Sequence, residues 1–108
     1  MSDFSDVGAF HAHFGLATDG PPTESDRTTR DARLRFILAE VRELAEAYGY
    51  VLTYTLAPPA PNHAIDLACV ARELVDVAYV VLGTARFHRL PWARIFRSVH
   101  RANMRKVR

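Results

Sequence analysis

The chain has 108 residues, the length of one domain with a modest hydrophobic core, so we expect a single domain over residues 1–108. Its hydrophobic fraction of 49% and charged fraction of 24% are ordinary for a soluble globular protein, and its single cysteine, Cys69, excludes an internal disulfide. The net charge of +2 is small, but no acidic residue follows Asp76, so the basic C-terminal part favours either a polyanion partner or self-complementary packing.

The N-terminal segment predicts a short helix. Its acidic start, MSDFSD, is no signal or transit peptide, which together with the lone cysteine favours a cytoplasmic protein. Ser2 or Ser5 can cap the helix, and Gly15 is expected to end it before a loop over residues 15–26. The residues that recur at helical spacing are Phe4, Val7, Phe10, His11 and Phe14.

The clearest predicted element is a second helix over residues 28–48. Thr28, with Asp31 three residues later, fits a capping box, and Gly49 stands at the expected stop. One apolar stripe runs along it: Leu34, Ile37, Leu38, Val41, Leu44, Ala45 and Tyr48.

Residues 50–56 have strand propensity but no second strand to pair with. Because an isolated strand is not stable, we expect either an extended loop or a small ribbon formed between two copies of the chain. Residues 57–62, APPAPN, then form a stiff linker.

A third helix is expected over the apolar stretch 64–83, with Asn62 as its cap and a break near Gly83. The stretch is too long for a strand, and its uncharged run, 77–85, is too short to span a bilayer. We therefore expect a largely buried helix. Its repeating apolar positions are Ile65, Leu67, Val70, Leu74, Val77, Ala78 and Val81.

A fourth helix is expected to have Pro91 in its first turn and to run to the C-terminus. Its inner stripe consists of Trp92, Ile95, Phe96 and Val99. The four elements together predict an all-α domain of four helices.

Two pairs of carboxylates are placed for metal chemistry. Glu73 and Asp76 lie about 60° apart around the third helix, on a strip with Cys69 and Val80 that we expect to be at least half buried. Glu40 and Glu43 form a second such pair, beside the apolar stripe of the second helix. Like charges at this spacing repel one another, and a hard cation such as Mg²⁺ would neutralise them.

Two simpler interpretations compete with a metal site. Glu40 and Glu43, taken alone, fit a solvated helix face. The acids of the third helix would instead be structural if they paired with Arg33, Arg42 or Arg72. The presence of matching pairs on two helices favours the metal site.

The fourth helix carries two further features. Asn103 and Lys106 continue its inner strip, where an amide and an ammonium group can bind polar or phosphate groups. The opposite face carries a stripe of arginines, which fits a solvated face better than a nucleic-acid reader. The stripe consists of Arg94, Arg97, Arg101, Arg105 and Arg108.

These motifs, taken in order, resemble the all-α nucleoside triphosphate pyrophosphohydrolases, a superfamily that includes the MazG-like enzymes, the dimeric dUTPases and the phosphoribosyl-ATP pyrophosphohydrolases. The resemblance rests on EVRE at 40–43, ELVD at 73–76 and an Asn-x-x-Lys element at 103–106, and it covers most of the chain. Residues 48–63 do not follow a pattern of the family.

The resemblance implies a four-helix MazG-like bundle completed by oligomerisation, as a homodimer or a dimer of dimers. It implies hydrolysis of a nucleoside triphosphate between the α and β phosphates, in nucleotide-pool house-cleaning or dNTP hydrolysis. Mg²⁺, or alternatively Mn²⁺, would be held by Glu40, Glu43, Glu73 and Asp76, with Glu40 or Glu43 as the base. Asn103 and Lys106 would contact phosphate or sugar. Phe10 or Phe14 would stack on the nucleobase, unless both serve core packing.

A second hypothesis belongs to another class. The basic tail also suits a non-catalytic helical module that binds nucleic acid or a protein through the arginine-rich fourth helix. The paired carboxylates favour the enzyme, no membrane is expected as a partner, and nucleic acid is the less favoured ligand.

Overall fold

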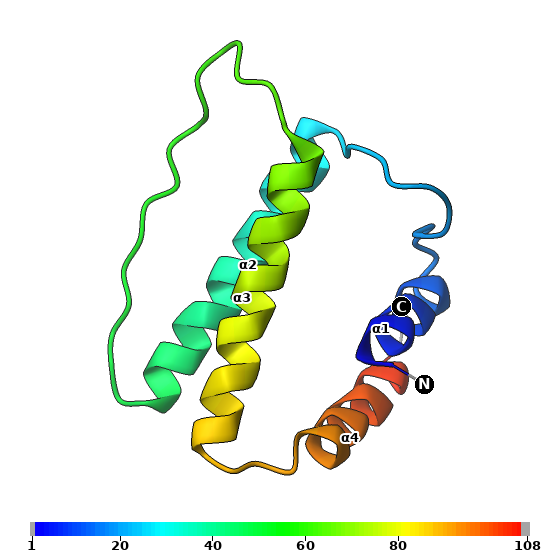
Figure 1. Cartoon of the computed structure of the whole chain (residues 1–108), viewed down its shortest axis with the longest axis vertical. Helices are drawn as coiled ribbons and strands as arrows, with labels where there is room; N and C mark the ends of the chain where they lie inside the picture. The colour runs from blue at the N-terminus through cyan, green and yellow to red at the C-terminus, as the bar shows by residue number, and fades with distance from the viewer. Residues whose placement is uncertain (1, 107–108) are drawn as a thin grey trace. The chain divides into compact units, whose positions relative to one another are not determined.

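The computed structural model describes residues 2–106, and within them the chain forms four α-helices and no strand (Figure 1). The helices are α1 (Asp3–His13), α2 (Arg27–Ala47), α3 (Leu67–Phe87) and α4 (Trp92–Met104). This confirms the predicted all-α class. None of these helices has the length and apolar character needed to cross a membrane.

The chain divides into two compact units. One contains α1, α3 and α4, and the other, residues 23–67, contains α2 and the segment that follows it. Packing between helices is concentrated between α1 and α4, which belong to the same unit.

Both serines predicted at the start of α1 contribute to its cap. The Ser5 backbone N–H donates to the Ser2 hydroxyl at 3.1 Å, and the Ser2 backbone N–H donates to the Ser5 hydroxyl at 3.1 Å. This reciprocal arrangement is a capping box. The helix ends before Gly15, whose φ of 76° lies in the left-handed region that glycine adopts without strain. The predicted start and stop of this helix are confirmed.

The residue that caps the N-terminus of α2 is not the predicted one. The cap is Asp26 and not Thr28, because the Asp26 carboxylate accepts a 2.7 Å hydrogen bond from the Thr29 backbone N–H. An ionised carboxylate is a stronger acceptor than a threonine hydroxyl. This hydrogen bond lowers the pKa of Asp26. At the other end the prediction holds, since Gly49 has a φ of 89°.

Replacing Asp26 with Ala is expected to lower the melting temperature at neutral pH, because the first turn of α2 loses its acceptor. The pKa of Asp26 is lower in the folded protein than in the unfolded chain. The stabilisation by this cap is therefore fully present above the unfolded pKa of about 3.9, and it is lost as the pH falls through the folded pKa. Thermal unfolding by circular dichroism at pH 7 and about pH 2 tests this. Asp26→Asn, which keeps an acceptor, is the control. Equal losses at both pH values would contradict it.

Residues 50–60 have no regular secondary structure, so the predicted extended loop is confirmed, while a ribbon between copies stays a prediction. The loop is tied to α2 by a cation–π contact, in which the Arg42 guanidinium lies 5.6 Å from the centre of the Tyr54 ring. Leu52 and Leu56 are half-buried. The loop is thus anchored to its own unit by alternate side chains.

Two predictions about α3 are wrong, one about its start and one about its interior. The helix begins at Leu67, after an extended stretch, so Asn62 is too far away to cap it. It also runs through Gly83 without a break, and the Thr84 hydroxyl donates to the Val80 carbonyl at 2.9 Å. It ends where Arg89 adopts a φ of 55°. Because a non-glycine residue takes this conformation, the sequence carries no glycine signal for the end.

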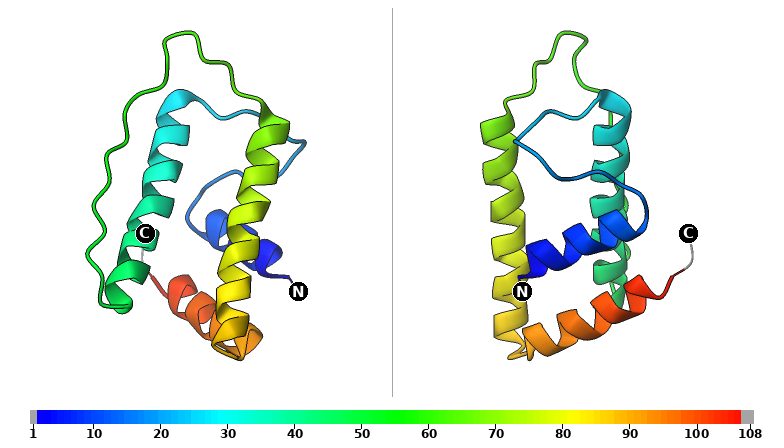
Figure 2. Two further views of the ribbon diagram at one scale, coloured as in Figure 1. Left: turned by 60° about the vertical axis from the view of Figure 1, so that its left-hand side comes forward. Right: turned by 90° about the vertical axis from the view of Figure 1, so that its right-hand side faces the viewer.

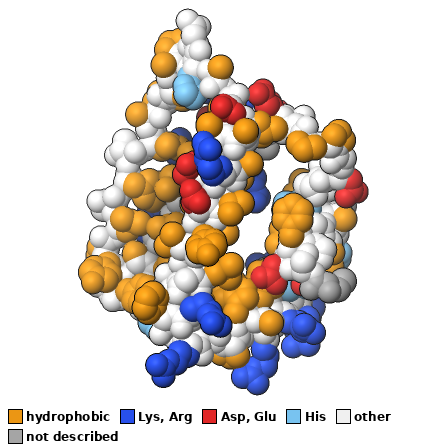
Figure 3. All heavy atoms as spheres, viewed as in Figure 1, with side chains coloured by type: hydrophobic (Ala, Val, Ile, Leu, Met, Phe, Trp, Pro, Cys, Tyr) orange, Lys and Arg blue, Asp and Glu red, His pale blue; other side chains and the backbone are white. Residues whose placement is uncertain are grey.

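The prediction that α3 is largely buried is wrong for the single chain. Every residue from 68 to 82 is exposed, and among the described residues Ala85 is the buried one. The space-filling view shows hydrophobic side chains on the open surface along this helix (Figure 3). The helix itself is confirmed, but no element of the described chain covers its predicted apolar face.

Helices α1 and α4 run side by side and parallel, as both views of Figure 2 show. Their N-terminal ends are joined by a hydrogen bond of 3.0 Å from the Trp92 indole N–H to the Asp3 carboxylate. Pro91 occupies the N-cap position of α4 and not its first turn. Since the helices are parallel, the C-terminal half of α1, with Phe10 and Phe14, lies at the same end of the pair as Asn103.

Candidate active site

The first carboxylate pair lies on α2. Glu40 and Glu43 are exposed, and neither forms a hydrogen bond or ion pair with any residue that the structure describes. The contact of the loop with α2 is made by Arg42, which projects roughly 100° or more away from both glutamates around the helix axis. The loop is therefore anchored on the other flank of α2, and both glutamates remain open to solvent.

The second pair lies on α3. Glu73 and Asp76 are both exposed, whereas we expected their strip to be at least half buried. The reason is that packing in this unit is formed by α1 and α4, which leaves residues 68–82 of α3 uncovered. Neither acid forms an ion pair or hydrogen bond among residues 2–106.

The arginines that would make these acids structural have other contacts. Arg33 lies over the Phe36 ring at 5.6 Å, and Arg72 donates to the Cys69 sulfur at 3.4 Å. Arg42 is engaged with Tyr54, as described above. The interpretation of the carboxylates as structural ion pairs is therefore not realised in the described part of the chain.

The chemistry of the four carboxylates suits a hard cation. All of them offer anionic oxygen ligands that form no ion pair with an arginine in the described part of the chain, and such oxygens are the donor set that Mg²⁺ and Mn²⁺ prefer. The two pairs belong to different units. Over residues 2–106, no three His, Cys, Asp or Glu side chains gather into a group that could hold a metal ion.

The predicted substrate-binding residues lie at the C-terminal end of the α1–α4 pair. Asn103 is half-buried and Lys106, one turn later, is exposed, with its backbone N–H donating to the Asn103 carbonyl at 3.2 Å. Phe14 is half-buried, and its ring centre lies 4.7 Å from that of Phe10. This contact is compatible both with packing and with a platform for a nucleobase.

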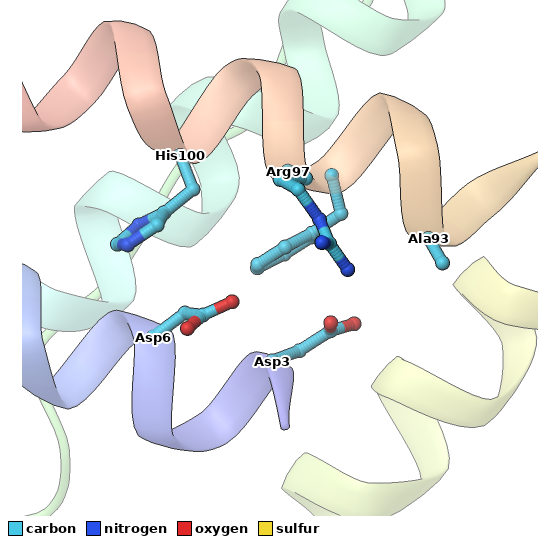
Figure 4. Close-up of a pocket in the computed structure, with 6 residues that line it drawn as sticks. Asp3, Asp6, Ala93, Arg97 and His100 are labelled. Carbon is cyan, nitrogen blue, oxygen red and sulfur yellow. The ribbon is translucent and has the colours of Figure 1, made fainter. Parts of the chain in front are cut away.

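A groove between α1 and α4 was missed by the sequence analysis. It has a volume of about 270 Å³, and its walls carry acids from α1 and bases from α4 (Figure 4). It is lined by Asp3, Asp6, Ala93, Phe96, Arg97 and His100. The available signal was a matching three-residue spacing of Asp3 with Asp6 and of Arg97 with His100, which places each pair on one side of its helix.

Comparison with known families decides the broader identity. The phosphoribosyl-ATP pyrophosphohydrolase family matches residues 7–103 of this chain. The chain belongs to this family. Neither a curated protein nor a solved structure matches the chain. The phosphoribosyl-ATP pyrophosphohydrolase family is part of the all-α MazG-like superfamily, so the resemblance drawn from the motifs is confirmed.

Membership of the phosphoribosyl-ATP pyrophosphohydrolase family makes the chain a pyrophosphohydrolase, a hydrolase that cleaves a phosphoric anhydride in a nucleotide. The matched range includes all four carboxylates and Asn103, and it ends before Lys106. It also begins after Asp3 and Asp6. The acidic wall of the groove therefore lies outside the part of the chain that matches the family.

Proposed function

We propose that the chain is an Mg²⁺-dependent nucleoside triphosphate pyrophosphohydrolase that yields a nucleoside monophosphate and pyrophosphate. The observation that carries this proposal is the pair of carboxylate strips, both exposed and, among residues 2–106, unpaired with arginine, within a match to a pyrophosphohydrolase family. Strips of this kind have no structural role in the described chain, whereas a phosphate-binding metal site needs them.

Glu40, Glu43, Glu73 and Asp76 are the proposed metal ligands, with Mn²⁺ as the alternative to Mg²⁺. When bound, the metal polarises a phosphate and lowers the pKa of a water molecule. Glu40 or Glu43 accepts a proton from the water that attacks phosphorus, the phosphoric anhydride bond breaks, and pyrophosphate leaves. A carboxylate is suited to this step because it carries no proton of its own at neutral pH.

Asn103 and Lys106 are the proposed contacts to sugar and phosphate. The Lys106 ammonium is exposed at the end of α4, where a polyphosphate can approach it, and the Asn103 amide can both donate and accept. Phe14 is the proposed platform for the base. The parallel pairing of α1 and α4 supports this set, because it brings Phe14 and Asn103 to the same end.

We propose that the active enzyme is a homodimer or a dimer of dimers of single-domain chains in the cytoplasm. The metal ligands come from two helices in different units, and α3 leaves its apolar face uncovered. A second copy would cover this face and allow both carboxylate strips to contribute to one site. Oligomerisation thereby completes the helical bundle.

Two nucleotide classes are candidates for the substrate. Nucleoside triphosphates, including deoxynucleotides, fit a role in house-cleaning or dNTP hydrolysis, and we favour them because the resemblance drawn from the motifs implies this activity. Phosphoribosyl-ATP is the second candidate because it gives the matched family its name.

The decisive experiment is a panel of ribo- and deoxyribonucleoside triphosphates and phosphoribosyl-ATP with Mg²⁺. We expect equal amounts of monophosphate product and pyrophosphate, with no activity after chelation by EDTA. The assay must resolve pyrophosphate from orthophosphate. Release of orthophosphate, or no hydrolysis of any member of the panel, would exclude the proposed reaction.

One observation favours the alternative function, a non-catalytic module that binds nucleic acid or a protein. Arginine side chains gather where α3 ends and α4 begins (Figure 3). The arginine stripe of α4 itself contains no aromatic residue, so nucleic acid bound by this stripe would be held by phosphate contacts alone. Such binding weakens steeply with salt, and the alternative therefore requires tight binding that survives physiological salt.

A further inference from the structure

The groove between α1 and α4 has walls of opposite charge. Figure 4 shows Arg97 and His100 on α4 pointing toward Asp3 and Asp6 on α1. Within residues 2–106, neither Arg97 nor His100 forms an ion pair or hydrogen bond with either acid. Opposite charges that face each other across an open groove without touching leave room for a ligand with donors on one edge and acceptors on the other.

The two aspartates are not equivalent. Asp3 accepts the 3.0 Å hydrogen bond from the Trp92 indole and thereby joins the N-terminal ends of the two helices. Asp6 is half-buried and makes no such contact, so its carboxylate is the acceptor available to a ligand. Arg97 is the matching donor on α4, with a planar fork of N–H groups.

The groove also offers an aromatic surface. Phe96 lines it and is half-buried, and its ring centre lies 6.2 Å from that of Trp92, with the two planes inclined at 33°. Ala93, one turn before Arg97, leaves space beside the ring. A flat heterocycle can therefore lie against Phe96 while its edges reach the charged walls.

We propose that this groove binds the guanine base of the nucleotide substrate. Guanine places two donors, N1–H and the 2-amino group, on one edge, where the Asp6 carboxylate can accept both. Its O6 and N7 acceptors lie together on the adjacent edge and suit the Arg97 guanidinium.

The other common bases fit these walls less well. Adenine and cytosine place a ring-nitrogen acceptor next to their amino group, and this nitrogen would face the carboxylate, which is acceptor-only when ionised. Uracil and thymine flank their one N–H with two carbonyl oxygens, which the carboxylate also repels. An acidic wall opposite a guanidinium therefore selects guanine.

The groove would be the base subsite of the proposed enzyme in place of Phe14, which does not line it, and in this respect the inference rests on the proposed function. From Arg97, the candidate sugar contact Asn103 lies six residues along α4, or about 9 Å of helix axis. Asn103 also lies about 120° around the helix from Arg97, so the sugar and phosphates of a bound guanine nucleotide would extend along the α1–α4 pair toward the end that carries Asn103 and Lys106. Because Asp6 precedes the range matched by the family, the base preference would be a property of this chain.

The test compares kcat/KM for GTP and dGTP with that for the other nucleotides, in wild type and in Asp6→Asn. We expect wild type to favour guanine nucleotides by about 10- to 100-fold, the range that a good bidentate contact gives. Asp6→Asn is isosteric and offers an amide donor. It should lose this preference and gain activity toward xanthosine triphosphate, which has a carbonyl in place of the 2-amino group. Equal activity of wild type on all bases, or an equal loss on all bases in Asp6→Asn, would overturn the proposal.

A second variant pair and a binding measurement separate this proposal from the proposed reaction. Arg97→Gln should lose guanine preference, while Arg101→Gln, on the same helix and outside the groove, should keep it. Calorimetry with GMP, AMP, CMP and UMP measures the base preference without an anhydride to cleave. Pyrophosphate release from all bases with no preference for GMP would sink the guanine subsite alone. Preferential GMP binding without pyrophosphate release would support the subsite and exclude the reaction.

Discussion

Asp76→Asn and Glu73→Gln are each expected to lower Mg²⁺-dependent hydrolysis by at least about 100-fold, because each removes an anionic ligand from the metal site. A metal ion contributes several kcal/mol of transition-state stabilisation, and each 1.36 kcal/mol corresponds to about tenfold in rate. The effect should be on pyrophosphate release and should not be rescued by raising the nucleotide concentration.

The same variants should leave the metal-free fold intact. Both acids are exposed and form no ion pair with any arginine that the structure describes, so a neutral isostere breaks no ion pair there and removes a like-charge repulsion. The free energy of unfolding in chelator should then change by less than about 0.5 kcal/mol, or rise slightly. If the acids instead formed buried ion pairs, the same changes would cost about 3–5 kcal/mol.

Thermal unfolding of wild type and both variants, in Mg²⁺ and in EDTA, distinguishes these cases. Mg²⁺ should raise the melting temperature of wild type and not that of the variants, because only a protein that binds the ion gains from it. Glu24→Gln, at an exposed position in the loop before α2, is the matched control and should behave like wild type. Variants that unfold much earlier in EDTA, or that retain full activity, would contradict the metal site.

The ends of the helices show where local sequence is sufficient and where it is not. Ser2 caps the start of α1, and Gly49 follows the end of α2. Both depend on residues only a few positions away, and both were predicted. Asp26 was missed because it lies only two residues before Thr28, and both are residue types that cap helices. The stronger hydrogen bond, which the Asp26 carboxylate accepts, decides between them. Arg89 carries no signal at all, since a left-handed conformation at a non-glycine residue is imposed by the surrounding chain.

Within the candidate site, too, some parts follow from local sequence and others do not. The strips of Glu40 and Glu43, and of Glu73 and Asp76, follow from helical geometry alone and were predicted from spacing. The groove was not predicted, because it depends on the docking of α1 against α4. The hydrogen bond that joins their ends spans 89 positions of the sequence. The burial of α3 was mispredicted because an apolar stripe shows that a face needs a cover, but not that the cover lies in the same chain.

Because the apolar face of α3 is exposed in the single chain, we expect the chain to form at least a dimer at micromolar concentration. Large apolar side chains on α3 are widely exposed in the single chain, including Leu74 at 52% and Val81 at 42%. Burying such surface contributes about 25 cal/mol per Å², and a domain of this length has little other core. Light scattering should therefore give a multiple of the 12.2 kDa chain mass.

Val81→Glu tests this directly, because it places a charge in the apolar stripe of α3. It should reduce the mass to one chain, lower the melting temperature and abolish pyrophosphate release, since the proposed site needs the assembled bundle. Tyr79→Glu is the matched control. It introduces the same charge on the same helix, but Tyr79 projects roughly 160° away from Val81 and is 77% exposed. Tyr79→Glu should therefore keep the mass and the activity. A wild-type chain that stays a stable, folded monomer of 12.2 kDa would show that the apolar face of α3 needs no second copy.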